Sequence, residues 1–193
     1  MDIFDELNEN GEKTGRRITR EEAHKLGLWH NAAVLFVINE KEQVVLQKRS
    51  LDKPNWPGKL DVSSGGHTNA GEETVDTAIR ELLEELEIEA DPKDVKVIGR
   101  VKSQDREGGM TNNHFNNYFI VTVENLDVKK LKFQKGEVDS AVLIDYPELK
   151  QLINARDDSL TSKWEAWDAF VDYIEKCKSD EQANRQNKSA MEY

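Results

Sequence analysis

A run of glutamates near the middle of the chain has the residue types and the spacing to bind a metal ion. Glu81, Glu84 and Glu85 stand at positions i, i+3 and i+4. On an α-helix with about 100° per residue, these side chains lie within an arc of about 100°. Like charges at this spacing repel one another, and the macrodipole near a helix C-terminus disfavours negative charge as well. Folding alone therefore gives no reason to gather three carboxylates on one face.

A hard divalent cation supplies such a reason. Mg²⁺ and Mn²⁺ prefer oxygen ligands and keep coordination positions for water and substrate phosphates. Such an ion polarises a phosphoryl oxygen and lowers the pKa of an attacking water. Gly65 and Gly66 precede the glutamates, and a backbone without Cβ atoms approaches closely enough for a carbonyl to join the ligands. The alternative interpretation is a solvated acidic face with nothing bound.

The charge of the whole chain agrees with phosphate chemistry that relies on cations. The 193 residues include 27 Lys and Arg against 38 Asp and Glu, which gives a formal net charge of −11. This balance disfavours a long basic surface, so we expect no nucleic-acid partner. An acidic protein that holds a polyphosphate needs local positive charge, most simply from bound divalent ions.

The composition also limits the cellular compartment. Cys177 is the single cysteine, which excludes an internal disulfide and a multi-cysteine zinc cluster. No run of residues approaches the roughly 20 apolar residues of a membrane span, and residues 1–6 are acidic rather than typical of a signal peptide. We therefore expect a cytoplasmic protein without a membrane partner.

The elements that must position the glutamates follow from the periodicity of the apolar residues. Helical spacing over residues 72–87 is set by Val75, Ala78, Ile79, Leu82 and Leu86. Shorter apolar runs predict strands at about 32–38, 44–46, 60–62, 95–101, 115–123 and 138–144. Strands that alternate with a long helix predict an α/β sandwich.

The two ends of the chain have their own signals. The Asn-Gly pair near position 10 predicts a hairpin over residues 3–18, and Thr19 with Glu22 predicts a capping box at the start of a short helix. An apolar pattern predicts a final helix at about 160–178. Residues 179–193 have almost no apolar side chains, so we expect a disordered tail after a single domain over residues 1–178.

The glutamates belong to a longer pattern of fixed spacing. The chain matches G-x5-E-x7-R-E-U-x-E-E-x-G-U, where U is apolar, at Gly66, Glu72, Arg80, Glu81, Leu82, Glu84, Glu85 and Ile88. In this box, which covers residues 66–88, the chain resembles the Nudix hydrolase family. Glu87 departs from the pattern, because the family has its second glycine there, in the turn that leaves the helix.

The resemblance implies a Nudix-type α/β/α sandwich with a mixed sheet and a metal site. It implies that Glu84 and Glu85 are ligands of Mg²⁺ or Mn²⁺. Glu81 is expected to be a ligand or to orient the attacking water, and the Gly65 carbonyl is expected to complete the coordination shell.

The same resemblance assigns a supporting role and a reaction. Arg80, which we count with the catalytic residues, is expected to pair with Glu72 and to hold the loop that starts at Gly66 against the helix. The implied reaction is hydrolysis of a phosphoanhydride bond in a nucleoside diphosphate linked to another moiety, or in a related small-molecule diphosphate. A homodimer is an expectation from the family alone.

The segment before the box resembles the isopentenyl-diphosphate isomerase branch of this superfamily. Residues 46–50 and 56–58 carry this likeness, together with the N-terminal hairpin and the helix that contains His24. The resemblance implies a cysteine where this chain has Gly65, and two glutamates of a later strand that hold the isomerase's metal with histidines. The corresponding segment here, 111–115, has no carboxylate. Hydrolysis is therefore preferred, with an isomerase-type enzyme and a non-catalytic nucleotide-sensing module as alternatives.

Three further features each have two interpretations. The histidines suggest a zinc or manganese site, or serve as polar or capping residues, since no HxH or HxxxH spacing joins His24, His30, His67 and His114. Trp56 could stack on a ring of the substrate or could pack its own loop. Glu137 precedes a predicted strand and is either a further carboxylate of the substrate site or a surface residue.

Overall fold

The central strand, β3 (His30–Ile38), contains the longest apolar run of the chain and is buried on both faces. The computed structural model describes residues 2–107 and 110–191. In it, β3 pairs in parallel with β8 (Met110–Thr122) and antiparallel with β4 (Gln43–Arg49) and β6 (Ser64–His67). The sheet is therefore mixed, as predicted.

The rest of the sheet extends on both sides of this strand. The main order is β5-β4-β3-β8-β7, in which β5 is Leu60–Asp61 and β7 is Lys96–Glu107. The last strand, β9 (Val138–Asp145), pairs with β4. Near the two ends of β3 the partner changes, since β6 pairs with residues 32–35 and β4 with residues 37–38. This arrangement brings β6 beside the middle of the sheet, next to the helix that carries the glutamates.

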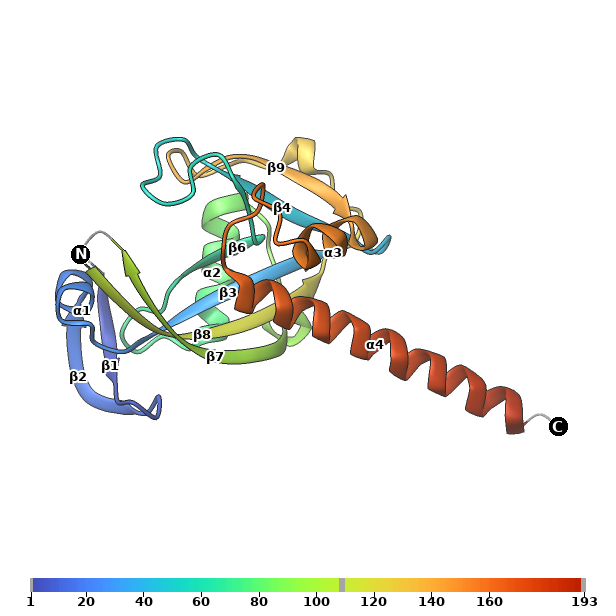
Figure 1. Ribbon diagram of the computed structural model, residues 1–193, viewed down its shortest axis with the longest axis horizontal. Helices are drawn as coiled ribbons and strands as arrows, with labels where there is room; N and C mark the ends of the chain where they lie inside the picture. Colours follow the sequence, from blue (N-terminus) through green and yellow to red (C-terminus); the bar gives the residue numbers. More distant parts are fainter. Residues whose placement is uncertain (1, 108–109, 192–193) are drawn as a thin grey trace.

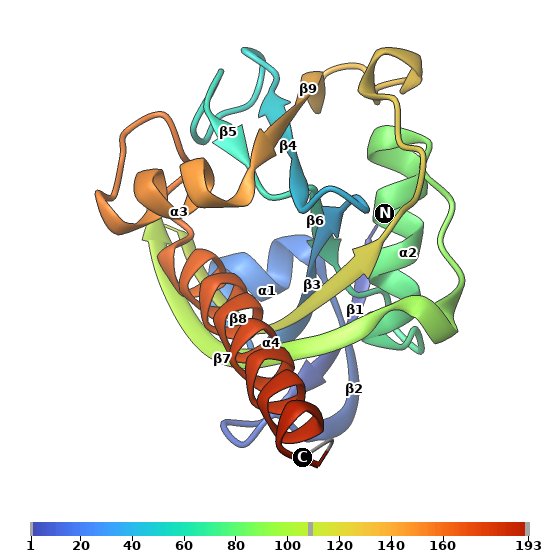
Figure 2. The same ribbon diagram turned by 90° about the vertical axis from the view of Figure 1, so that its right-hand side faces the viewer.

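Helices cover both faces of the sheet (Figures 1 and 2). Alternate residues of β3 point to opposite faces, as in any strand. One set contacts α2 (Thr74–Leu86), and the other packs with α3 (Tyr146–Asn154) and α4 (Trp164–Met191). The α2 side contains Ala33, Leu35, Val37, Ala78, Leu82 and Leu86, and the opposite side contains Val34, Phe36, Leu149, Trp167 and Phe170. These three layers confirm the predicted α/β/α sandwich.

The N-terminal hairpin and short helix form a small unit at one end of the sheet (Figure 1). Strands β1 (Ile3–Leu7) and β2 (Lys13–Thr19) pair antiparallel, and α1 (Arg20–Leu26) follows directly. The predicted capping box is present: the Thr19 hydroxyl accepts from the Glu22 N–H, and the Glu22 carboxylate accepts from the Thr19 N–H. This unit has its own small apolar core, of Phe4, Ile18 and Ala23.

The C-terminal helices differ from the prediction. Helix α3 was not predicted, although Tyr146 and Leu149 are buried and a proline stands in its first turn. Helix α4 begins at Trp164 rather than near 160 and continues to Met191, so residues 179–191 are helical rather than a disordered tail. Ala, Gln, Glu, Lys and Arg in that segment favour a helix, and neither Gly nor Pro interrupts it. Residues 192–193 lie outside the described part.

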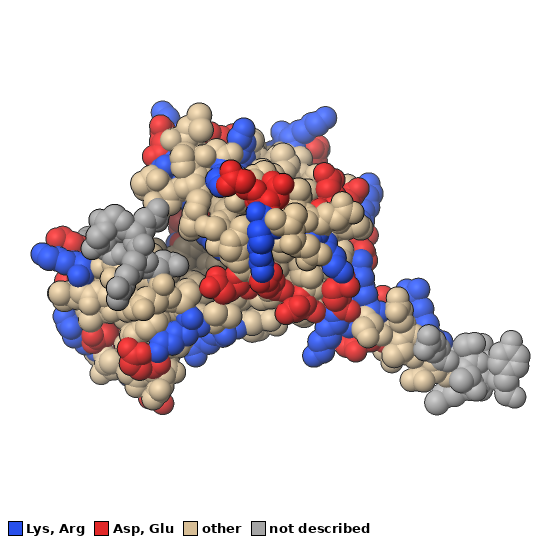
Figure 3. All heavy atoms as spheres, viewed as in Figure 1, with Lys and Arg blue, Asp and Glu red and all other residues tan. Residues whose placement is uncertain are grey.

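The outer half of α4 projects from the body of the molecule (Figure 1). Acidic and basic side chains are interspersed along this projection and over the face that Figure 3 presents. In the described part of the chain, no helix combines the length and apolar character that a membrane span requires.

Glu87 ends α2 in the left-handed conformation, with φ 51° and ψ 36°. A residue with a Cβ is strained there, which explains why the Nudix box has glycine at this position.

We expect Glu87→Gly to raise the free energy of unfolding by about 0.5–1 kcal/mol, measured by urea denaturation. The relief of backbone strain outweighs the loss of the exposed ion pair between Glu87 and Lys132. Glu89→Gly is the control, since exposed Glu89 has no positive φ. An equal effect in both variants would contradict this account.

Candidate active site

The three box glutamates lie on α2 and line one cavity with the glycines of β6. This cavity has a volume of about 530 Å³ and includes Gly65, Gly66, Glu81, Glu84 and Glu85 in its wall. Glu85 is buried and Glu81 is nearly so, whereas the side chain of Glu84 is 47% exposed. The structure thus brings together the residues that the sequence predicts as a metal site.

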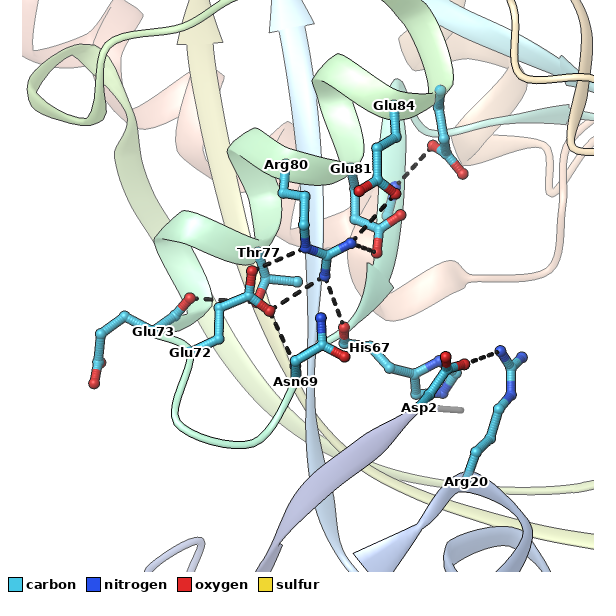
Figure 4. Close-up of polar contacts among 12 residues, drawn as sticks. Asp2, Arg20, His67, Asn69, Glu72, Glu73, Thr77, Arg80, Glu81 and Glu84 are labelled. Atoms are coloured by element: carbon cyan, nitrogen blue, oxygen red, sulfur yellow. Dashed lines mark hydrogen bonds and ion pairs between the residues drawn. The ribbon is translucent and has the colours of Figure 1, made fainter.

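The Arg80 guanidinium is the centre of a hydrogen-bond network beside this cavity (Figure 4). Its Nε and Nη2 donate to the two oxygens of Glu72, at 2.9 and 3.2 Å. Its Nη1 donates to Glu81 Oε1 at 2.7 Å and to Glu84 Oε2 at 3.4 Å. Nη2 also donates to the His67 carbonyl at 3.2 Å. Arg80 thereby joins the loop before α2, the end of β6 and two of the glutamates.

Gly66 leaves the space that the Glu81 carboxylate occupies. A Cβ at position 66 would lie 2.1 Å from Glu81 Oε1 and 2.3 Å from Glu81 Cδ, far inside van der Waals contact. Because this glycine has no positive φ, its role is to allow close approach rather than an unusual backbone conformation. The first glycine of the box is therefore needed for the position of Glu81.

Burial shifts the titration of the two inner glutamates. It raises the pKa of Glu85 to about 8, and the charge of Glu81 adds to the effect. Burial also raises the pKa of Glu81, against the opposing influence of Arg80. Glu85 Oε2 accepts hydrogen bonds from Gly65 N–H and Gln47 Nε2, both at 3.2 Å. Crowded carboxylates that are partly removed from water fit a divalent cation, since its charge would favour their ionised forms.

Gly65 contacts the site through its N–H, which donates to Glu85 Oε2. A carbonyl oxygen and a carboxylate are both acceptors, so no hydrogen bond can report whether they lie together. The predicted carbonyl ligand therefore stays a prediction.

The two residues predicted to bind substrate lie in different cavities. Glu137 lines the carboxylate cavity and forms an ion pair with Lys53, which lines it too. Trp56 lines a second cavity of about 470 Å³, with the Arg49 guanidinium 5.8 Å from its ring centroid. Both cavities share Gly65, Gly66 and His67 of β6. A ligand with two parts could therefore contact both cavities.

The four histidines, for which a zinc or manganese site was one of two interpretations, lie together in the structure. His24, His30, His67 and His114 each offer one nitrogen, and these atoms all lie within 4.8 Å of one another. Spacing rules such as HxxxH could not find them, because they come from α1, β3, β6 and β8. Pairing across the sheet brings them together instead, since His30 lies directly opposite His114.

Comparison with known proteins shows the family of this chain. A family model described as NUDIX domain matches residues 28–164. The chain belongs to the NUDIX domain family. It is 36% identical over 159 residues to Nudix hydrolase 3 of Arabidopsis thaliana, covering 80% of this chain but 20% of that protein. It is 31% identical over 163 residues to an uncharacterized Nudix hydrolase of Clostridium acetobutylicum, covering 83% of this chain and 76% of that protein. These relatives support a Nudix hydrolase enzyme.

Solved structures agree on the fold. The crystal structure of a Deinococcus radiodurans protein superposes with a TM-score of 0.66 and 18% identity, covering 86% of this chain and 97% of that one. Part of the chain is also similar to isopentenyl-diphosphate Delta-isomerase of Rhizobium rhizogenes, at 34% identity over 91 residues, which cover 47% of this chain and 43% of that protein. The likeness to the isomerase branch is thus partial, and isomerases with this fold belong to the same superfamily.

Gly66→Ala tests the close approach of β6 to Glu81. We expect the variant to fold, because the flexible Glu81 side chain can move away from the new methyl group, but to bind Mn²⁺ at least tenfold more weakly by calorimetric titration. Gly99→Ala is the matched control, since its Cβ would make only ordinary contacts, at 3.4 Å or more. Unchanged Mn²⁺ affinity in Gly66→Ala would show that Glu81 does not depend on this space.

Glu85→Gln tests the cost of the buried carboxylate. The pKa of this carboxyl rises from 4.5 to about 8 on folding. Below about pH 4.5 the group is protonated in both the folded and the unfolded chain, and the folded state has its full stability. As the pH rises toward 8, the unfolded chain loses this proton first, so the free energy of unfolding falls. In chelator-treated protein, we therefore expect Glu85→Gln to be more stable than the wild type at pH 8, by on the order of a few kcal/mol, and the difference to shrink near pH 5. Thermal denaturation at both pH values measures this. A difference independent of pH would contradict it.

Proposed function

We propose that the chain is a metal-dependent Nudix hydrolase that cleaves a phosphoanhydride bond in a nucleoside diphosphate linked to another moiety, or in a related organic diphosphate. The observation that carries the proposal is the cavity in which Glu81, Glu84 and Glu85 converge while Arg80 holds two of them. Such a group of carboxylates, with its inner members desolvated, suits a cation and the phosphate oxygens that share it.

The three glutamates would hold Mg²⁺ or Mn²⁺, with the Gly65 carbonyl as the further ligand that the family implies. When bound, the ion would supply charge stabilisation for the phosphoryl oxygens and would lower the pKa of a bound water. Oxygen ligands and the acidity of the cavity support Mg²⁺ over ions that prefer nitrogen or sulfur.

The chain's own residues would bind and orient the diphosphate. Arg80 fixes the Glu81 carboxylate through a 2.7 Å hydrogen bond, which leaves the other Glu81 oxygen to orient the attacking water and to accept its proton. Lys53 and Arg20 line the same cavity and form ion pairs with Glu137 and Asp2, respectively. Exchange of these carboxylate partners for substrate phosphates would attract the diphosphate into the cavity.

The organic part of the substrate would extend into the second cavity. Trp56 offers a ring for stacking there, and Asn112, Asn116 and Ser103 line the same space with groups that can donate or accept hydrogen bonds. A base or another polar ring suits this combination of an aromatic face and amides. This cavity shares Gly65, Gly66 and His67 of β6 with the carboxylate cavity, which suits a substrate with a diphosphate at one end.

A phosphorus-NMR product assay with Mg²⁺ or Mn²⁺ tests the proposal. The panel contains nucleotide sugars, dinucleoside polyphosphates, nicotinamide and flavin dinucleotides, coenzyme A, thiamine diphosphate and isopentenyl diphosphate. We expect metal-dependent cleavage of at least one compound and a loss of at least about 100-fold in kcat with Glu85→Gln, whereas Glu89→Gln, outside the site, keeps the wild-type rate.

Two other outcomes would each select an alternative. Rearrangement of isopentenyl diphosphate without cleavage would favour an isomerase-type enzyme despite Gly65. Tight binding of a nucleotide without any product, in protein saturated with metal ion, would favour a non-catalytic sensing module.

A further inference from the structure

A buried carboxylate near the second cavity is paired with two cations. Asp61 of β5 is fully buried, and its Oδ2 accepts from Arg49 Nη1 at 2.9 Å and from Lys163 Nζ at 2.8 Å. Burial alone would raise the pKa of Asp61, but Lys163 and Arg49 hold it below its ordinary value, so the carboxyl is ionised. We call these three residues the Asp61 ion group. One negative charge faces two positive charges in it, which leaves a surplus positive charge.

The acceptor positions of Asp61 are all in use. Its Oδ1 accepts from the Thr161 hydroxyl and from the Val62 N–H, both at 2.9 Å, so each carboxylate oxygen accepts two hydrogen bonds. An ammonium has three donors, and a carboxylate accepts about four hydrogen bonds. The bond to Asp61 uses one donor of Lys163. Lys163 can therefore donate to a ligand while it stays bound to Asp61.

The backbone around Lys163 is fixed to β5 and to α4. The Leu60 N–H donates to the Ser159 carbonyl, and the Leu60 carbonyl accepts from the Thr161 N–H, both at 2.8 Å. The Lys163 carbonyl accepts from the Ala166 N–H in the first turn of α4, at 3.0 Å. Because Lys163 is held at its backbone and at its ammonium, little further ordering is needed when a ligand binds it.

Lys163 lines the cavity that we assign to the organic part of the substrate. Among the described residues in the wall of this cavity, Lys163 is the one Lys or Arg, and its side chain is 29% exposed. His67 and His114 line the same wall, but burial lowers the pKa of both, so these rings are neutral at pH 7. Glu165 also lines it, but its charge is exposed and therefore weakened by water and salt. The cavity thus offers a fixed positive charge.

The charge of Lys163 also reaches the carboxylate cavity. Burial raises the pKa of Glu85 and lowers the pKa of His114, and the Lys163 charge acts to lower both. The ammonium therefore lies within electrostatic range of residues that line each of the two cavities. A ligand whose diphosphate occupies the carboxylate cavity can place a further anion against Lys163.

We propose that Lys163 selects substrates whose organic part carries a second anionic group, namely a phosphate ester on the ribose of a nucleotide. The inference rests on the proposed function, which assigns the diphosphate to the carboxylate cavity. In a nucleotide the ribose joins the base to the diphosphate, so its phosphate ester would lie near both cavities, as Lys163 does. Asn55 and Ser162 line the second cavity too, and they offer an amide and a hydroxyl to the oxygens of the same phosphate.

Nucleotides without a phosphoanhydride bond test this selection apart from activity. The full chain in excess Mg²⁺ is titrated in a calorimeter with adenosine 5′-monophosphate, adenosine 2′,5′-bisphosphate and adenosine 3′,5′-bisphosphate. The proposed reaction cannot cleave any of them. We expect at least one bisphosphate to bind at least about tenfold more tightly than the monophosphate, since a charge-assisted hydrogen bond is gained. Equal affinities, or no binding of any of the three, would overturn the proposal.

Variants of Lys163 show whether this residue carries the selection. Lys163→Gln keeps a donor for Asp61 and leaves Arg49 to balance its charge, so we expect a folded protein, which circular dichroism checks. The advantage of the bisphosphate should fall below about threefold, and Lys163→Arg should restore most of it. Lys59→Gln is the matched control, because the Lys59 side chain is also 29% exposed and pairs with Asp158, but lines neither cavity. A folded Lys163→Gln protein with the full advantage would overturn the proposal.

The phosphorus-NMR assay then separates this inference from the proposed function. Cleavage of a diphosphate by a protein that binds the monophosphate and both bisphosphates equally would overturn the role of Lys163 alone. Tighter binding of a bisphosphate that depends on Lys163, without cleavage of any compound in the panel, would support the role of Lys163 and overturn the hydrolase reaction.

Discussion

The carboxylate site depends on the hydrogen bonds of Arg80. Two carboxylates beside each other on one side of a helix, such as those of Glu81 and Glu84, would turn away from one another toward water if nothing restrained them. The guanidinium opposes this by bonding Glu81 and Glu84, while its bidentate pair with Glu72 fixes the guanidinium itself. Because an arginine is always protonated and presents a rigid array of donors, it can donate to five acceptor atoms of four residues at once. Lysine, a flexible point charge, has no comparable geometry.

The carboxylate site was predictable because its signal is local. Glu81, Glu84 and Glu85 share one helix, and their mutual position follows from helical geometry alone. The contact of Glu72 with Arg80 spans only eight residues and also follows from the box. The α/β sandwich was predictable for a similar reason, since each apolar period belongs to one element. Helix α3 was missed because its nine residues are too few for a clear period next to a strand.

The group formed by His24, His30, His67 and His114 was left with two interpretations, a metal site or polar and capping residues, because its signal is not local. Its members are separated by 6, 37 and 47 residues (24 to 30, 30 to 67 and 67 to 114), and their meeting depends on strand register. His30 is opposite His114 in a parallel pair, and His67 is opposite Ala32 in an antiparallel pair. A single sequence contains no direct record of either register. The end of α4 was misjudged for another reason: low hydropathy indicates exposure, but an exposed segment with good helix formers can remain helical.

Strand β6 has a consequence for how this protein can change over evolutionary time. Its neighbouring residues Gly66 and His67 pair with Ala33 and Ala32, so they face opposite sides of the sheet, one toward Glu81 and the other toward the histidines. A shift of one residue in the register would reverse both directions together. An insertion or deletion in this four-residue strand therefore displaces Gly66 and His67 together. Variation between descendants should for this reason concentrate in the loops around the strand.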